Sequence, residues 1–227
     1  MENSNRKIIS RRDRPAKEPL SHELIVKTAY ELLKEQGIAG MSMRKVAKAL
    51  DTGPSSLYVY VKNFQELSSL VLDHGLGQLV LPEQKQDSWK ENLIGALSAY
   101  FLLLYEEPGI AELTFSSIPK GTNFLKLTEY ILATLQDGGM HSKSAAWGVD
   151  LLLLYVSSVA YEHTSRKKHG NMQISDIKEA FQNVDPVLFP VLFSLREEMF
   201  SGDMKSMERF HWGLEVLIHG IQYFSKK

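Results

Sequence analysis

Apolar residues recur at spacings of three and four along most of the chain, which is the pattern of amphipathic helices. The first such repeat contains Leu24, Ile25 and Ala29. Comparable patterns predict helices over 21–36, 42–50, 54–62, 63–79, 88–107, 108–115, 123–136, 143–167, 186–200 and 204–225. The segment 143–167 is apolar around most of its circumference, so we expect it to be buried on several sides. No stretch alternates in the manner of a strand, and the sequence therefore predicts an all-α protein.

Turn and cap residues divide this helical chain into parts. Residues 1–20 lack periodicity and contain two prolines, which predicts a flexible basic arm. Residues 21–67 form a unit of three short helices and the start of a fourth, linking helix, with Ser21 as its first N-cap. Residues 68–227 are expected to form a larger helical domain for ligand binding and dimerisation. Its polar stretch 168–183 is expected to be a flexible loop.

The segment 42–62 has the features of a helix-turn-helix. Ala47 is small enough for two helices to cross closely, Gly53 lies in the turn, and Leu57 and Val61 fall on the inward side. The remaining face carries side chains suited to DNA: Arg44 for phosphate, and Ser55, Ser56, Tyr58 and Tyr60 for phosphates or base edges. Two short helices around a glycine turn also occur in ordinary helix packing, and Tyr58 could instead be wedged between helices.

Charge is distributed unevenly along the chain. Residues 1–63 carry 12 Lys and Arg against 7 Asp and Glu, whereas the other 164 residues carry 14 against 20. The net charges are therefore +5 and −6. This asymmetry indicates a polyanionic partner that meets the N-terminal part alone. A solvated charged tail is the alternative reading of the basic residues in positions 6–14.

The residues from Ser42 to Leu67 closely resemble the DNA-binding segment of the TetR (tetracycline-repressor) family. The pattern Ala29, Leu32, Leu33 and Gly37 belongs to the same resemblance, and 189–220 resembles the tetracycline-repressor-type ligand domain. The resemblance implies that Arg44 contacts phosphate and that Pro54, Ser55, Ser56, Tyr58, Val59 and Tyr60 face the major groove. Phe64 departs from the family, because many members have a lysine there that meets the DNA backbone. Lys62 and the basic arm are the candidates to replace that contact.

The predicted middle helices are rich in aromatic residues, which favours an apolar ligand pocket with a few polar groups. The candidate ligand-binding residues are Tyr100, Phe115, Asn123, Trp147, Tyr155, Ser158 and Glu162. A well-packed aromatic core is the alternative. In tetracycline-binding members of the family, one histidine coordinates the magnesium ion and another holds the drug. Alignment puts Leu113 and Val80 at these positions, which disfavours tetracycline–magnesium and favours a bulky apolar or aromatic effector.

Several classes of chemistry are disfavoured by residues that the chain lacks. Without cysteine there is no disulfide, thiolate metal site or cysteine nucleophile. The seven histidines show neither metal-ligand spacing nor a catalytic arrangement, so we expect no metal, no cofactor and no enzyme activity. A polar N-terminus and the absence of a sufficiently long apolar run predict a cytoplasmic protein without membrane contact.

Together these features predict a DNA-binding transcriptional regulator, a repressor that a small effector releases from a palindromic operator. We expect a homodimer, formed by 143–167 and by the stripe Phe210, Leu214, Leu217, Ile218, Ile221 and Phe224 of the last helix. One alternative is a helical interaction protein on the same scaffold that no longer binds DNA, which the residue Phe64 keeps open. Another is an all-α enzyme, which the missing catalytic arrangement disfavours.

Overall fold

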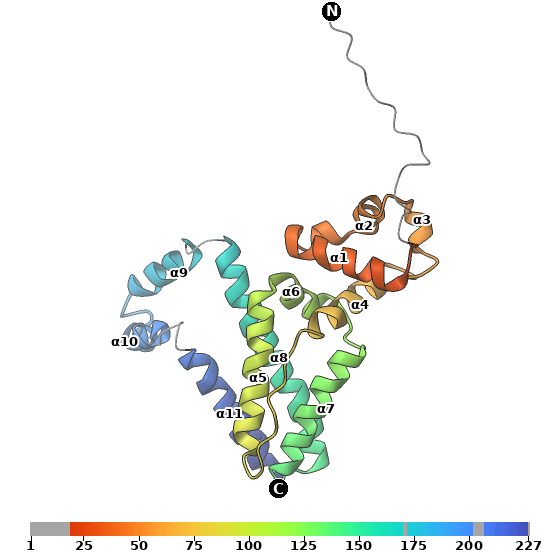
Figure 1. The fold of residues 1–227 in the computed structure, drawn as a ribbon. Helices are drawn as coiled ribbons and strands as arrows, with labels where there is room; N and C mark the ends of the chain where they lie inside the picture. The colour runs from red at the N-terminus through yellow and green to blue at the C-terminus, as the bar shows by residue number, and fades with distance from the viewer. Residues whose placement is uncertain (1–18, 170–171, 202–206, 227) are drawn as a thin grey trace, which may run out of the picture.

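The computed structural model of the protein describes residues 19–169, 172–201 and 207–226, and the basic residues of the predicted arm lie outside them. All regular secondary structure in the described residues is helical, which confirms the all-α class. Figure 1 shows a small N-terminal head above a larger body. The head contains α1 (His22–Gln36), η2 (Ile38–Met41), α2 (Met43–Ala49) and α3 (Pro54–Leu57). The helix α4 (Phe64–Leu76) leads from the head into the body.

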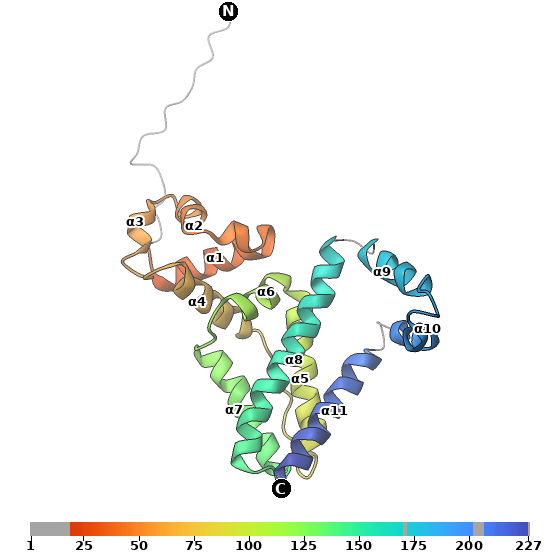
Figure 2. The same ribbon diagram turned by 180° about the vertical axis from the view of Figure 1, so that it is seen from behind.

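The body contains α5 (Trp89–Glu106), α6 (Pro108–Ser116), α7 (Thr122–Asp137), α8 (Ser142–His169) and α11 (Glu208–Ser225). Its central helix is α8, which packs against α5, α6, α7 and α11. Figure 2 shows α8 running between α7 and α11. Its segment Ser142–Ser165 is long and apolar enough to cross a membrane. From the sequence, no apolar segment of this length was expected. Leu152, Val156 and Ala160 are nevertheless fully buried among the other helices, as in the core helix of a folded domain.

One face of each helix of the head is buried in a hydrophobic core that continues into the body. Ser21 accepts a hydrogen bond from the Leu24 amide at 3.1 Å and so begins α1. Ile25, Ala29 and Leu33 follow at helical spacing and are buried. They lie on the face of α1 that packs against α2 and α4. This packing holds the three helices in place beneath the outer surface of the head.

The stretch between α8 and α11 is helical rather than the flexible loop expected over 168–183. The helix α8 continues to His169, and α9 spans Met172–Gln182. The sequence signal that was missed is the spacing of four between Ile177 and Phe181. In the structure the ring of Phe181 meets the ring of Phe200 edge-on, with 5.3 Å between the ring centroids. The single helix expected over 186–200 is replaced by α10 (Pro190–Leu195) and η3 (Glu198–Phe200). We call residues 172–201 the lateral segment, because they project sideways from the body (Figure 1).

The apolar stripe expected to join two subunits through the last helix belongs mostly to the core of one subunit. Phe210, Leu214, Ile218 and Ile221 are buried against the body, with 3%, 0%, 0% and 8% of their surfaces exposed. The helix α11 instead exposes another apolar face. That face carries Trp212, Val216, Tyr223 and Phe224.

Candidate DNA-binding surface and ligand cavities

The helix-turn-helix is built by caps and a tight turn between α2 and α3. Ser42 accepts a hydrogen bond from the Lys45 amide at 3.4 Å and begins α2. After α2, Asp51 adopts a left-handed backbone with φ of 49°, and the Thr52 amide donates to the carbonyl of Ala47 at 2.9 Å. Pro54 then occupies the first position of α3, where its missing N–H costs nothing. Ala47 is buried, which agrees with its predicted place at the helix crossing.

The predicted recognition residues lie largely exposed at the outer end of the head. Leu57 and Val61 are buried as expected, while Tyr58 and Val59 expose 54% and 81% of their surfaces. The exposure of Tyr58 contradicts its alternative placement as a wedge between helices. The third helix is shorter than predicted, because α3 ends at Leu57 and residues 58–60 form a turn.

The short α3 follows from the cap of the next helix. Asn63 accepts a hydrogen bond from the Glu66 amide at 2.8 Å, and this cap requires the extended backbone that Asn63 adopts. Glu66 in turn accepts from the backbone amide of Lys62 at 2.6 Å. The chain therefore leaves the helical conformation before Asn63, and the Lys62 side chain is exposed beside α4.

Tyr60 has a structural partner that sequence reasoning did not find. Its hydroxyl donates to the carbonyl of Leu20 at 2.7 Å, forty residues away in the chain. This bond ties the segment before α1 to the recognition turn. Tyr60 therefore helps to fix the start of α1, in addition to lying at the exposed surface.

A basic residue absent from the sequence prediction lies beside Arg44. Lys48 follows Arg44 by one turn of α2, and both are exposed. The two line a hollow of about 550 Å³ together with Asp51, Thr52, Gly53 and Pro54. Lys48 could have been found from the sequence, because it follows Arg44 by four positions and therefore lies on the same exposed face of α2. Arg44 and Lys48 thus present two cations next to the turn of the helix-turn-helix.

The head and α4 meet the body through contacts of α1, η2 and α4 with α6, and of α4 with α7. Gly75 of α4 lies so close to Ile110 of α6 that an added Cβ atom would come within 2.4 Å of the isoleucine side chain. Gln78 donates a hydrogen bond to the hydroxyl of Tyr30. Lys34 of α1 forms an ion pair with Glu107 at 2.8 Å, and this partner raises the pKa of Lys34. The junction therefore combines close packing with polar links.

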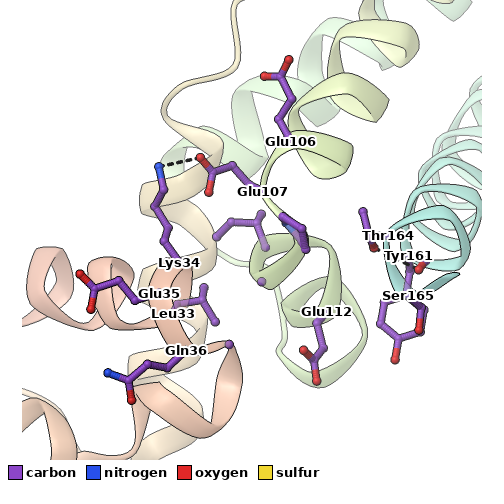
Figure 3. A pocket seen from close by; sticks show the side chains of 14 residues that line it. Leu33, Lys34, Glu35, Gln36, Glu106, Glu107, Glu112, Tyr161, Thr164 and Ser165 are labelled. Carbon is purple, nitrogen blue, oxygen red and sulfur yellow. Dashed lines mark hydrogen bonds and ion pairs between the residues drawn. The ribbon is translucent and has the colours of Figure 1, made fainter. Parts of the chain in front are cut away.

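A cavity of about 510 Å³ lies in this junction. Figure 3 shows the end of α1 on one side, the start of α6 in the middle, and Tyr161, Thr164 and Ser165 of α8 on the other. Carboxylates dominate its charged lining. They belong to Glu35, Glu106, Glu107 and Glu112, and Lys34 is the cation among the lining residues.

The predicted ligand-binding residues occupy different environments in the described structure. Tyr100 is buried in the core and shares a hydrogen bond of 3.0 Å with Ser157, and burial raises its pKa to about 12. The hydroxyl of Tyr155 donates to the backbone carbonyls of Arg209 and Phe210. Trp147 exposes 68% of its surface. Tyr100 and Tyr155 thus have partners within the subunit, whereas Trp147 lies at the surface.

The other four predicted residues are also separated. Asn123 bonds to Asp73 of α4 rather than facing a cavity. Phe115 is half exposed and lies 5.4 Å from the ring of Tyr161. Ser158 and Glu162 are exposed on α8. Leu113, at the position of the family's metal-binding histidine, is fully buried in the hydrophobic core.

A second, more apolar cavity follows α7 on its outer side. This groove of about 740 Å³ is lined by Leu81, Gln84 and one face of α7 that includes Leu125, Tyr130 and Leu132. The Tyr130 hydroxyl oxygen is buried and has no hydrogen-bond partner in the described residues, and burial raises its pKa. Within those residues there is also no group of three or more His, Asp or Glu side chains placed to hold a metal ion.

Comparisons with known proteins agree with this architecture. Residues 25–67 match the family described as bacterial regulatory proteins, tetR family, and residues 81–224 match the tetracyclin repressor-like C-terminal domain. The crystal structure of apo ActR from Streptomyces coelicolor is 31% identical, with a TM-score of 0.83 over 92% of this chain and 100% of that one.

Two relatives known by sequence give the same result. The HTH-type transcriptional repressor DrrR1 of Streptomyces coeruleorubidus is 25% identical over 221 residues, which cover 92% of this chain and 81% of that protein. An HTH-type transcriptional regulator of Saccharopolyspora erythraea is 32% identical over 120 residues, 53% of this chain and 51% of that protein. The similarity to that second relative thus spans about half of its length.

The C-terminal match alone covers more than half of the chain, and the N-terminal match coincides with the helix-turn-helix of the head. Members of this family are DNA-binding regulators and not enzymes. The chain therefore belongs to the TetR family of transcriptional regulators.

Proposed function

We propose that the protein is a homodimeric repressor that binds a palindromic operator through its two heads and leaves it when a small apolar or aromatic effector binds the body. The observation that carries this proposal is the head itself. Leu57 and Val61 are buried and support a short recognition segment whose side chains are exposed or partly exposed. The segment comprises Pro54, Ser55, Ser56, Tyr58 and Val59.

The side chains of the head suggest a division of labour on DNA. Arg44, Lys48 and Lys62 are exposed cations around the helix-turn-helix and suit phosphate contacts. Ser55, Ser56 and Tyr58 present hydroxyl groups that suit base edges or phosphates, while Tyr60 anchors the start of α1 through Leu20. In this arrangement the cations supply affinity for DNA in general, and the hydroxyl side chains supply preference for sequence.

Two neighbouring apolar faces support the homodimer. On α8, Trp147, Leu151 and Leu154 expose 68%, 43% and 54% of their surfaces at spacings of four and three. On the adjacent α11, Trp212 and Val216 expose 69% and 50%. A two-fold axis would pair these faces as a four-helix interface, because isologous contacts bring the same patch of both subunits together. Exposed apolar patches of this kind are typical of protein interfaces.

The lateral segment gives further support for a second subunit. Among the described residues, its α9 packs against α8, and the carbonyl of Met199 accepts a hydrogen bond from Arg209 of α11 at 3.1 Å. Its exposed apolar residues include Val187, Leu188, Phe189, Val191 and Leu195, each at least half exposed. A partner subunit lying against α8 and α11 would be close enough to cover part of this surface.

The proposed effector class is supported by the apolar groove and by similarity. The groove along α7 combines Leu81, Leu125 and Leu132 with the polar or charged side chains of Gln84, Lys126 and Glu129, a combination that suits an apolar molecule with a few polar groups. ActR, 30% identical over 92% of this chain, has been solved in complex with actinorhodin. We therefore expect the effector of this protein to be mainly apolar, with polar groups that fix its orientation.

The proposal is tested by fluorescence anisotropy with labelled duplexes from the DNA that flanks the protein's own gene. We expect wild-type protein to bind one of these duplexes saturably. An unlabelled, unrelated duplex of the same length and concentration should not displace it. Wild-type protein that binds every duplex equally, or none, would contradict a sequence-specific regulator. Absence of all binding would favour the alternative of a helical interaction protein, to which Phe64 points because it replaces a basic side chain and is 39% exposed.

A further inference from the structure

The link between the head and the body includes a helix cap shared by two helices that are far apart in sequence. Asp73 lies on α4, the helix that leads out of the head, and α7 begins fifty residues later. The Oδ1 atom of Asp73 accepts hydrogen bonds from the backbone amides of Asn123 at 2.9 Å and Phe124 at 3.0 Å. These are amides of the first turn of α7, which have no partner within their own helix. Asp73 therefore does for α7 what an N-cap residue normally does.

The local N-cap of α7 cannot supply these bonds, which makes the contribution of Asp73 necessary. The residue before α7 is Gly121, and it makes no side-chain cap hydrogen bond. Its lack of a side chain is also what admits Asp73. A Cβ atom added at Gly121 would lie 2.0 Å from Cγ of Asp73. Gly121 thus leaves the cap position empty, and the carboxylate of another helix fills it.

The contact is reciprocal, so it fixes two helices rather than one side chain. The Asn123 side chain donates from Nδ2 to the backbone carbonyl of Asp73 at 2.9 Å. It also donates to Oδ2 of the same residue at 3.3 Å. A carboxylate at the N-terminus of a helix of 16 residues is further stabilised by the helix dipole. Backbone and side chain of both partners take part, so a shift of α7 along its axis would pull on α4.

We propose that Asp73 is a positioning residue that couples the orientation of the DNA-binding head to the position of α7. The inference rests on the proposed function only in that the head binds DNA and α7 borders the groove assigned to the effector. Contacts of α4 with α6 hold the head by packing, as at Gly75 and Ile110. Packing tolerates small slips, whereas the cap makes two charge-assisted bonds with fixed directions. The cap therefore restricts movement of α4 relative to α7, while the Lys34–Glu107 ion pair links α1 to the start of α6.

The experiment measures head orientation in the free protein, so that it is independent of any operator or effector. The chain contains no cysteine, which allows two cysteines to be placed at the exposed residues Glu31 of α1 and Lys126 of α7 and spin-labelled. Labelled chains are diluted with unlabelled protein so that distances within one subunit are observed. Double electron–electron resonance then gives the distance distribution between head and α7. Amide hydrogen exchange at Asn123 and Phe124 is measured on the same variants without labels.

Asp73→Ala should broaden the distance distribution or shift its centre by several ångströms. Exchange of the Asn123 and Phe124 amides should accelerate at least about fivefold, the factor that corresponds to a typical loss of an N-cap. Gly121→Ala should act in the same direction, because its methyl group displaces the carboxylate. Asp73→Asn retains an oxygen acceptor and should give a smaller effect. It also keeps the test usable if Asp73→Ala does not fold.

The matched control is Asn92→Ala, which removes another pair of side-chain hydrogen bonds to the backbone. Asn92 bonds to the amide and carbonyl of Lys85, so both partners lie outside the head and α7. It should lower stability without changing the distance distribution. The proposal is overturned if Asp73→Ala retains the wild-type distribution, or if Asn92→Ala broadens it equally. Failure of wild-type protein to bind DNA would overturn the proposed function instead and leave the cap measurement intact.

Discussion

The proposed dimer interface can be tested by placing one charge on the exposed face of α8. Leu154 is 54% exposed in the single subunit, although its neighbours Leu152 and Leu153 are buried. Full burial of a leucine side chain contributes about 1.5–3 kcal/mol, so covering half of it contributes about 1 kcal/mol. A two-fold interface contains the residue twice. Leu154→Asp therefore removes about 2 kcal/mol of apolar burial from the dimer.

The new carboxylates add a second cost. An unpaired buried polar group costs at least about 1 kcal/mol, again twice per dimer. The total is at least about 4 kcal/mol, which corresponds to about a thousandfold weaker dimerisation. Because the face is exposed in the single subunit, the fold of each subunit should persist. Ile218→Asp, at a fully buried position of α11, should instead unfold the subunit.

Sedimentation velocity over a concentration series measures the dissociation constant, and circular dichroism measures the helical content of the same samples. We expect wild-type protein and Leu154→Met to be dimers, and Leu154→Asp to be a folded monomer at micromolar concentration. A Leu154→Asp protein that dimerises as tightly as wild type would refute the assignment of this face. So would a wild-type protein that is monomeric at these concentrations.

Three further predictions concern the head and the core. Arg44→Ala and Lys48→Ala should each reduce the slope of log affinity against log salt by about 0.9 per subunit, measured by DNA titrations at several salt concentrations; unchanged slopes would exclude phosphate contacts. Tyr58→Ala should change the ranking of operator variants in a binding competition, whereas Tyr60→Phe should chiefly lower thermal stability by removing the bond to Leu20; the reverse pattern would contradict their assigned roles. Burial raises the pKa of Tyr100 from 10.0 to about 12, so the unfolded phenol ionises first and the free energy of unfolding should fall between pH 10 and 12. Denaturant titrations should show a fall that is larger in wild type than in Tyr100→Phe by roughly 2–3 kcal/mol, because Tyr30, Tyr130 and Tyr155 also have raised pKa values and remain in the variant; an equal fall in both proteins would argue against the raised pKa of Tyr100.

The sequence predicted the all-α fold and the core of the helix-turn-helix because those features depend on local patterns. Cap residues, a glycine turn and apolar spacing all occur within a few positions of one another, as in the run from Ser42 to Leu57. The end of α3 was predicted too late, since the competing cap at Asn63 forces an extended backbone before α4. The helix α9 was missed because polar residues are interspersed among its apolar residues, which include Ile174, Ile177 and Phe181 at helical spacing.

The partners of the candidate ligand-binding residues could not be predicted in the same way, because they depend on tertiary packing. Tyr100 and Tyr155 are aromatic, but their partners are Ser157 and the backbone of α11, which no local pattern identifies. Asn123 was expected to hold a ligand, and its polar group instead serves the contact with Asp73. The stripe on α11 was correctly recognised as apolar, yet periodicity alone does not say whether an apolar face meets the same subunit or another.

The carboxylates around the junction cavity affect how the protein meets DNA before it binds. Glu106 and Glu112 lie immediately behind a head whose outer surface carries Arg44 and Lys48. A duplex that approaches from the side of the body therefore meets like charge, while one that approaches the head meets opposite charge. An encounter in which the body faces the DNA should be short-lived, and an encounter in which the head faces the DNA should last longer. The association rate, and not only the final affinity, should consequently rise as the salt concentration is lowered.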